Sequence, residues 1–270
     1  WLFRCVRFIG EDAKDIVVWG DSHAGHLTAG LAELFPQANI LMASMPACTA
    51  EAGFQGIEPI HKQKWKREKC VKVNEHILKW AQDHNKRAVF ILSSAKRGSA
   101  DQVANVLNAH IEKLQEFGHQ AAVFSDFIRP GIFLEQCRAV PSFLLTEKIL
   151  DKRCIVRKHD IDRETRYNKV LKEKVHSFIP ASDIQCPNGV CRFTYQGGRT
   201  FHRDNHHLSM GGSIVLLQEA YPEIVRKLPT LQSEPHRFVD FVALKPLEGK
   251  LVCKRPNSEN YEKDISAKFT

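Results

Sequence analysis

Short apolar runs alternate along the chain with longer segments in which apolar residues recur every three or four positions. Residues 16–19 are apolar throughout, as in parallel strands buried on both faces, and Leu27, Leu31 and Leu34 follow at helical spacing. The predicted strands are 15–19, 39–43, 88–92 and 120–125, and the predicted helices are 23–34, 60–84, 99–117, 162–178 and 209–228. This alternation predicts an α/β fold, a three-layer α/β/α sandwich with a mostly parallel sheet.

Other stretches are less regular. Residues 126–160 lack periodicity and predict a long loop, which in compact domains is typically functional or cross-linked. Residues 184–201 predict a short strand and a hairpin, and Tyr221-Pro222 is expected to kink or divide the last helix. Within helix 60–84 the side chains expected to be buried are Trp65, Val73, Ile77, Leu78 and Trp80.

These patterns divide the chain into three parts. We expect an N-terminal extension at residues 1–14, a central domain at 15–228 and a C-terminal extension at 229–270, with one further strand at 238–244. The start at Trp1 has no signal-peptide features, and no apolar run is long enough to cross a membrane. An export signal is therefore expected upstream of Trp1.

The composition suits one large globular domain, with 270 residues, 43% hydrophobic and 26% charged. The net charge of +8 comes from lysines and arginines spread along the chain rather than gathered in one block. No nucleic-acid-binding motif accompanies this charge, so no nucleic-acid partner is expected. A surface that faces anionic lipid head groups or an acidic glycan is the favoured interpretation.

Eight cysteines predict disulfides and an oxidising compartment. No Cys-x-x-Cys pair supports a structural zinc site, and buried free thiols are the remaining alternative. Proximity in the sequence favours Cys48–Cys70, Cys137–Cys154 and Cys186–Cys191, which leaves Cys5–Cys253, although eight cysteines permit about 105 pairings.

The candidate chemistry begins where the first strand ends, at Gly20-Asp21-Ser22. A serine on a tight strand-to-helix turn has an exposed hydroxyl beside the backbone N–H groups of a helix N-terminus. Ser22 could instead be a simple N-cap. A nucleophilic serine needs a base and an orienting acid, and Asp204 and His207, three residues apart, are suitable. His206 is a less favoured base, because adjacent side chains usually point apart.

Together, "WGDSHAGHL" and "DNHHLS" resemble the SGNH hydrolase superfamily, and most closely the periplasmic SGNH domain fused to membrane O-acyltransferases of acyltransferase family 3. The resemblance covers residues 15–228 and implies a flavodoxin-like SGNH catalytic domain. It implies Ser22 as nucleophile, His207 as general base and acid, and Asp204 as the residue that orients His207.

The resemblance also implies an oxyanion hole, formed by the serine N–H, a glycine and an asparagine. This sequence lacks the glycine and the asparagine at the ends of its second and third strands, so Ser22 and Ser44 are the candidate donors. Asp21 is expected to shape the turn by Asx-type bonding. His23 and His26 are expected to be surface or site-rim residues, and no metal site is expected.

Three functions remain open. The leading one is an O-acyltransferase, expected to be an O-acetyltransferase, that moves an acyl group through Ser22 onto a hydroxyl of lipopolysaccharide O-antigen, peptidoglycan or an exopolysaccharide. A partner membrane domain, expected in the same full-length chain, would use the acyl donor, expected to be acetyl-CoA, and this domain would bind no cofactor. The resemblance places the domain in the periplasm, tethered to the inner membrane through an upstream segment. The alternatives are a free-standing carbohydrate esterase and a non-catalytic glycan-binding module.

Overall fold

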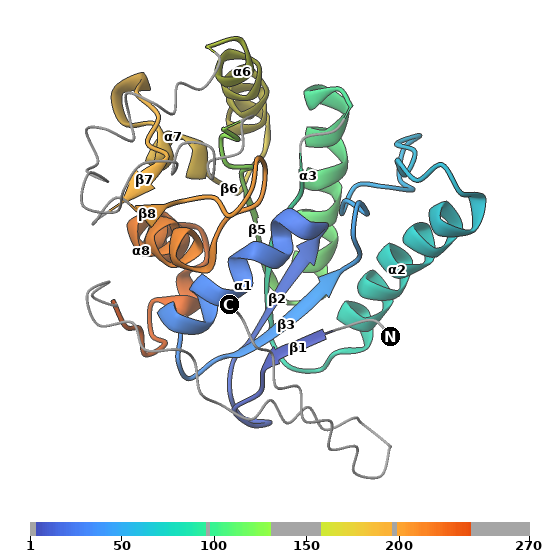
Figure 1. Ribbon diagram of the computed structural model, residues 1–270. Helices are drawn as coiled ribbons and strands as arrows, with labels where there is room; N and C mark the ends of the chain where they lie inside the picture. The colour runs from blue at the N-terminus through green and yellow to red at the C-terminus, as the bar shows by residue number, and fades with distance from the viewer. Residues whose placement is uncertain (1–3, 96–97, 131–157, 196–198, 239–270) are drawn as a thin grey trace.

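The computed structural model describes residues 4–95, 98–130, 158–195 and 199–238 (Figure 1). Its main sheet has six strands in the order β1-β3-β2-β4-β5-β6. They are β1 (Arg4–Arg7), β2 (Asp15–Gly20), β3 (Asn39–Ser44), β4 (Val89–Ser93), β5 (Gln120–Phe124) and β6 (Phe178–Ile179). All neighbours pair in parallel except β1, which is antiparallel to β3. The mostly parallel sheet is therefore confirmed.

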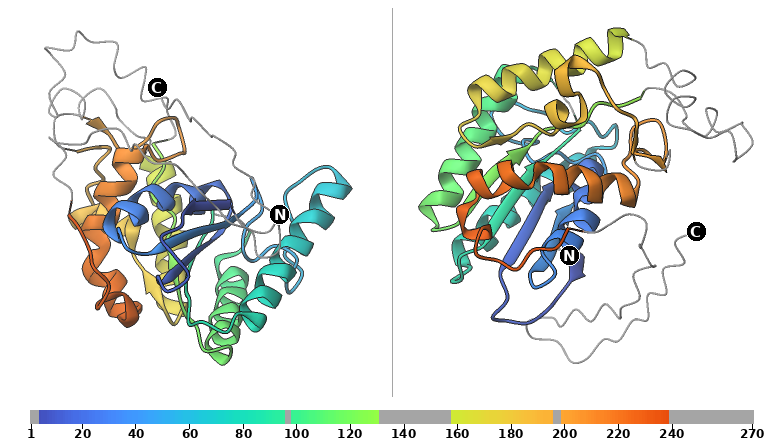
Figure 2. Two further views of the ribbon diagram at one scale, coloured as in Figure 1. Left: turned by 90° about the horizontal axis from the view of Figure 1, so that it is seen from below. Right: turned by 90° about the vertical axis from the view of Figure 1, so that its left-hand side faces the viewer.

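Helices cover both faces of this sheet (Figures 1 and 2). The long helices are α1 (Ser22–Leu34), α2 (Lys64–Asp83), α3 (Ala100–Glu116), α6 (Lys158–Lys174) and α8 (Met210–Lys227). One apolar core joins the sheet to α1 and α8, through residues such as Leu31 and Leu217. The other joins it to α2, α3 and α6, through residues such as Ile77, Leu107 and Leu171. These two cores make the three predicted layers.

The order of the parallel strands indicates where on the sheet a ligand site is expected. From β2 the chain first adds β3 on one side and then β4, β5 and β6 on the other. Ligand sites of open α/β sheets lie at such a reversal, at the carboxyl ends of the strands. Gly20 at the end of β2 is level with Ser44 of β3 and Ser93 of β4. Ser22 therefore follows the strand at the reversal itself.

Several local predictions were wrong. Residues 4–7, expected in an extension, form the edge strand β1. The expected strand near Ile184 is a short helix, α7 (Ala181–Gln185), followed by a 3-10 turn, η2 (Pro187–Gly189), because Pro187 suits the first position of a helical turn. The hairpin strands β7 (Thr194–Tyr195) and β8 (Arg199–Thr200) come after the cysteine turn rather than around it. The sequence also missed β6, which is only two residues long.

The last helix and the end of the chain also differ from the predictions. Helix α8 is not divided at Pro222, because the exposed proline lies opposite the buried Ala220 and Ile224, which hold both halves on the core. A second 3-10 turn, η4 (Pro229–Leu231), follows α8. It contributes the buried Leu231 to the core, although the sequence placed it in an extension.

Two predicted disulfides are confirmed, Cys48–Cys70 and Cys186–Cys191. The first ties the loop after β3 to the second turn of α2. The pairs Cys137–Cys154 and Cys5–Cys253 rest on residues outside the described part of the chain, as do most of loop 126–160 and all but the first residue of the predicted strand 238–244. Among the described residues, no helix is long and apolar enough to span a membrane.

Candidate active site

A tight turn at the end of β2 presents Ser22. Gly20 has φ +151°, and a Cβ there would lie 1.8 Å from the carbonyl oxygen of Ser93, so only glycine fits. The Asp21 carboxylate accepts the backbone N–H of His23 at 2.9 Å and that of Ala95 at 3.2 Å. The expected Asx-type bond of Asp21 is thereby confirmed, and Asp21 rather than Ser22 is the N-cap of α1. Ser22 itself occupies the first turn of α1 and is half-buried.

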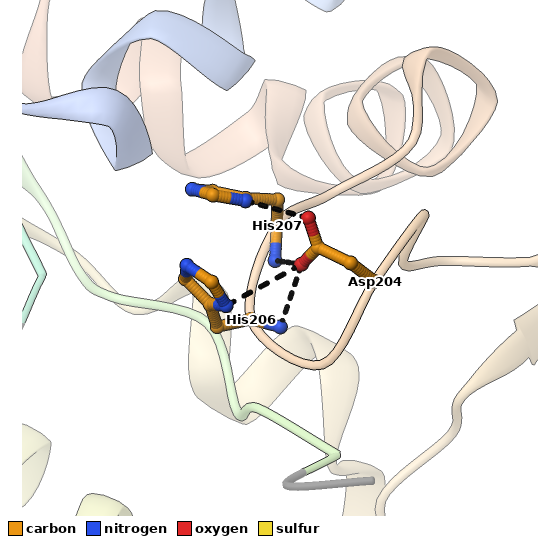
Figure 3. A group of neighbouring side chains, drawn as sticks. All are labelled: Asp204, His206 and His207. Carbon is orange, nitrogen blue, oxygen red and sulfur yellow. Dashed lines mark hydrogen bonds and ion pairs between the residues drawn. The ribbon is translucent and has the colours of Figure 1, made fainter. Parts of the chain in front are cut away.

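Asp204 organises the loop before α8 (Figure 3). Its Oδ1 accepts the backbone N–H groups of His206 at 2.9 Å and His207 at 2.7 Å, and its Oδ2 lies 2.7 Å from His207 Nδ1. Partial burial acts to raise the pKa of Asp204, but these hydrogen bonds outweigh it and lower the pKa to about 2. Asp204 is therefore ionised at neutral pH and holds the His207 ring in one orientation.

The other ring nitrogen of His207 reaches α1. His207 Nε2 lies 3.2 Å from Ser22 Oγ, across 185 positions of sequence. The loop is closed by a bond from Arg203 N–H to the His207 carbonyl at 2.9 Å, and Ser209 then caps α8 by accepting the N–H of Gly212. The structure thus brings together Ser22, His207 and Asp204. This geometry can pass a proton from the Ser22 hydroxyl to the imidazole.

The sequence led us to expect that the side chains of His206 and His207 point apart, and this expectation was wrong. Its ring centroid is 3.8 Å from that of His207, because Asp204 folds the backbone into a turn that directs both rings to the same side (Figure 3). Alternation of side chains holds for extended strands and not for such a turn. His206 Nδ1 contacts Asn205 Oδ1 at 2.6 Å. Burial and the neighbouring His207 lower the pKa of His206.

His23 is neither at the surface nor at the rim, so that expectation was wrong. It is 1% exposed, its Nδ1 lies 2.7 Å from Asp126 Oδ1, and its ring stacks on Phe127 with centroids 4.8 Å apart. Burial acts to lower the pKa of His23, but the Asp126 carboxylate outweighs this and raises it. Arg129 bonds the other Asp126 oxygen at 3.0 Å and Glu164 at 3.0 Å.

The sequence missed the roles of Asp126, Arg129 and Glu164 in this network. Its one usable signal was the position of Asp126 two residues after the buried strand β5, at the end of the sheet where the site lies. The structure also places the His23 ring 5.8 Å from the His207 ring, so a second histidine–aspartate pair lies beside the first.

Two further histidines, His26 and His202, lie near this loop. Each has a buried ring nitrogen without a hydrogen-bond partner among the described residues. His26, half-buried on α1, meets His207 edge to face at 4.6 Å, which agrees with a rim position. Burial, followed by the charges of His207 and His23, lowers the pKa of His26 to about 3. His202 is 1% exposed, and burial lowers its pKa to about 3. Both rings are therefore neutral at pH 7.

The candidate oxyanion donors lie at the ends of adjacent strands. Within the described residues, no hydrogen-bond acceptor contacts the Ser22 N–H at the start of α1. Ser44 is level with Gly20 on β3 and half-buried. At the end of β4, the N–H of Ala95 is already taken by Asp21. Ser22 and Ser44 therefore remain the candidate donors, and residue 95 is not available in this arrangement.

Asp204, His206 and His207 could also hold a metal ion, since a ligand atom from each lies within 4.8 Å of the others. The sequence predicted no metal site. His207 Nδ1 is bonded to Asp204, so a metal at His207 would need Nε2, the atom that faces Ser22. Metal binding and the Ser22–His207 contact are therefore alternatives.

A buried carboxyl group lies behind the turn. Glu51 is 1% exposed, and its Oε2 has no hydrogen-bond partner. Burial raises the pKa of Glu51 to about 7, with a further contribution from the Asp21 carboxylate. It lines an internal cavity of about 20 Å³ together with Ser93 and Asp126. No basic side chain compensates this carboxyl among the residues that line the cavity.

The doubly covered parallel sheet, with Ser22 at its reversal point and an Asp-x-x-His turn facing it, defines the class of SGNH hydrolase folds. The family model described as an SGNH domain fused to AT3 domains matches residues 4–222, and the chain belongs to this family. The match begins at β1, which agrees with its place in the sheet.

Solved structures with similar folds include proteins described as an SGNH hydrolase from Slackia heliotrinireducens and a GDSL-like lipase from Parabacteroides merdae. The first is 13% identical with a TM-score of 0.45, over 80% of this chain and 100% of the other. The second is 12% identical with a TM-score of 0.41, over 80% of this chain and 98% of the other. No curated protein sequence matches the chain significantly.

Proposed function

We propose that this domain is an O-acyltransferase that carries an acyl group, expected to be acetyl, on Ser22 and transfers it to a hydroxyl of a cell-surface glycan. The observation that carries the proposal is the line of contacts from Asp204 to His207 Nδ1 at 2.7 Å and from His207 Nε2 to Ser22 Oγ at 3.2 Å. This is the relation between acid, base and nucleophile that acyl transfer through serine requires.

In the first step His207 removes the proton of Ser22 as Oγ attacks the carbonyl carbon of the acyl donor. Asp204 stabilises the imidazolium that forms, and the Ser22 N–H, with Ser44 as the second candidate, donates to the oxyanion. His207 then protonates the leaving group, and an acyl ester remains on Ser22.

In the second step a sugar hydroxyl takes the place of the leaving group. His207 removes its proton, the hydroxyl oxygen attacks the acyl ester, and the Ser22 hydroxyl is restored when His207 returns the proton. Water in place of the sugar would give hydrolysis, the reaction of a carbohydrate esterase. The difference between the two functions lies in the acceptor and not in the acyl-enzyme.

Membership of a family of domains fused to AT3 domains supports a membrane acyltransferase domain as the source of the acyl group. In this proposal the membrane domain uses acetyl-CoA, and the SGNH domain works outside the cytoplasm without a cofactor of its own. The acceptors to test are lipopolysaccharide O-antigen, peptidoglycan and exopolysaccharide.

The test is release of p-nitrophenol from p-nitrophenyl acetate by the wild-type chain, Ser22→Ala and His207→Ala. We expect a burst followed by slow turnover, because the acyl-enzyme waits for a sugar, and we expect both variants to lose it. Ser99→Ala and the exposed His76→Ala are matched controls that should keep the burst. Fast steady turnover would identify an esterase, and release no greater than that of Ser22→Ala would contradict both functions and leave glycan binding without catalysis.

A further inference from the structure

Much of the net charge of the protein lies in one segment, which includes helix α2 and the residues on either side of it. Residues 60–87, which contain α2, carry nine lysines and arginines against three acidic residues, whereas the whole chain has 39 against 31. This segment therefore has a net charge of +6 out of +8. Acidic residues occur in this segment at about their average frequency, 3 in 28 against 31 in 270, but lysines and arginines are more than twice as frequent, 9 in 28 against 39 in 270. The even spread of basic residues expected from the sequence is therefore wrong for this segment.

An aromatic side chain stands in the middle of this charge. Trp65, predicted to be buried, is instead 59% exposed on the first turn of α2, with Lys66 Nζ 5.4 Å from its ring centroid. Lys62, Lys64, Lys69 and Lys72 are exposed around it. We call Lys62, Lys64, Trp65, Lys66, Lys69 and Lys72 the α2 patch.

Few of these charges are neutralised locally. Lys64 lies 3.8 Å from Glu68 and forms the one ion pair that the described residues give to the patch. The outer groove of α2, of about 670 Å³, is lined by Trp65, Lys69, Lys72 and His76. Its other acidic residue, Asp83, is paired with Lys79 at 3.0 Å. The patch is therefore a cationic surface with an exposed indole at its centre.

The patch lies at the same end of the sheet as Ser22. The Cys48–Cys70 disulfide fixes the second turn of α2 to the loop that leaves the carboxyl end of β3. A buried bond from Asn74 to the carbonyl of Ala52 at 2.8 Å fixes the next turn to the same loop. Figure 1 shows the first turns of α2 on the side toward which the arrow of β2 points. The patch thus has a fixed position relative to the candidate active site.

We propose that the α2 patch binds the surface of an anionic lipid bilayer and turns the candidate active site toward the membrane. Lysines bind anionic headgroups, and exposed tryptophan prefers the interface between headgroups and acyl chains. Domains of this family are fused to AT3 domains, which are the membrane domains of the proposed function, so the membrane is close. A surface with weak affinity is sufficient when its target is tethered nearby. Membrane binding itself does not depend on the proposed function. Its purpose does, because membrane binding would give Ser22 access to an acyl group delivered at the membrane.

The experiment is co-sedimentation of the 270-residue chain with vesicles of phosphatidylcholine, with and without phosphatidylglycerol. We expect binding to the anionic vesicles alone, weakened by added salt, with a blue shift of tryptophan fluorescence that Trp65→Ala removes. Lys66→Glu/Lys69→Glu should weaken binding at least tenfold, because each basic residue near an anionic surface contributes about fivefold in affinity.

A matched charge reversal separates the patch from overall charge. Arg166→Glu/Lys169→Glu changes two exposed positions on α6 by the same total charge and should bind almost as the wild type does. Equal loss in both variants, equal binding to neutral vesicles, or binding to an acidic polysaccharide but not to vesicles would overturn the proposal. Ser22→Ala should bind vesicles normally, so failure of the proposed chemistry and failure of membrane binding are distinguishable.

Discussion

Two histidine–aspartate pairs lie side by side in this protein, and the same bond has a different consequence in each. His207–Asp204 and His23–Asp126 both have an Nδ1–Oδ distance of 2.7 Å, and their two imidazole rings are 5.8 Å apart. The side chains of the first pair are 17% and 31% exposed, and those of the second are 2% and 5% exposed.

The partners of the two pairs explain the difference. His207 uses its free nitrogen to reach Ser22, and Asp204 is held by backbone N–H groups of its own loop. Asp126 is bonded to Arg129, and the His23 ring is stacked on Phe127. A pair with one open nitrogen and access to solvent can move protons, whereas a pair enclosed by charge and an aromatic ring fixes the helix that carries Ser22.

The largest effect should come from Asp204→Asn. An asparagine keeps the loop but favours the wrong tautomer of His207, and we expect the p-nitrophenol burst rate to fall on the order of 10³- to 10⁴-fold. Thermal unfolding should show a folded protein with a modest loss of stability, because the asparagine oxygen still accepts the backbone N–H groups of the loop but carries no charge. A burst rate within tenfold of the wild type would refute the assignment of Asp204 as the orienting acid.

The next effect concerns the buried pair. Asp126→Asn leaves His23 and Arg129 without their shared carboxylate, and breaking a buried pair costs about 3–5 kcal/mol, which urea unfolding will measure. The burst rate per folded molecule should fall far less than in Asp204→Asn. Asp183→Asn, which breaks the exposed pair with Lys172, is the matched control and should cost under about 1 kcal/mol. If Asp126→Asn stays folded but is as inactive as Asp204→Asn, the distinction between the two pairs fails.

Glu51 is another buried carboxyl near the turn, and it has no basic partner among the residues that line its cavity. Its pKa is raised from 4.5 to about 7, so between these values the unfolded state loses its proton first and the folded state loses stability as the pH rises. Glu51→Gln should therefore add about 3 kcal/mol above pH 7 and nothing below about pH 4. Urea unfolding against pH will test this, with the exposed Glu75→Gln as control. A stability gain that does not depend on pH would show that ionisation of the buried Glu51 carboxyl is not its cause.

The smallest effect should come from His206→Ala. The His206 ring lies beside His207, but its Nδ1 contacts Asn205, and no contact with Ser22 occurs among the described residues. We expect the burst rate to change by less than about threefold, measured beside His207→Ala. A loss as large as that of His207→Ala would make His206 a second candidate for the base.

The sequence predicted the parts of the site that depend on near neighbours. Asp21 bonds His23 two residues away, and Asp204 bonds His206 and His207 two and three residues away, so the residue types and spacing were sufficient. The alternation of apolar periods likewise predicted four parallel strands to within two residues. Strand β6 was missed because two residues are too few to establish a period.

The sequence predicted the pairing of Ser22 with His207 through its family resemblance, but it missed other contacts between distant segments. His23 and Asp126 are 103 positions apart, and nothing in either segment shows that the ring of the histidine next to Ser22 turns inward. Trp65 was expected to be buried for its apolar character, but its place on the outer side of α2 is fixed by Cys70 and Asn74, which face the loop after β3.

The sequence by itself therefore determined the turn at Ser22, the Asp-x-x-His turn and the alternation of strands and helices, because hydrogen bonds and periodicity over a few residues fix them. The contact of His207 with Ser22 across 185 positions was expected only from the family resemblance, and its geometry comes from the tertiary structure. The tertiary structure alone decided that His23 is enclosed and that Trp65 is exposed. These outcomes depend on how whole elements pack, which is the sum of many contacts between segments and is not encoded in any one of them.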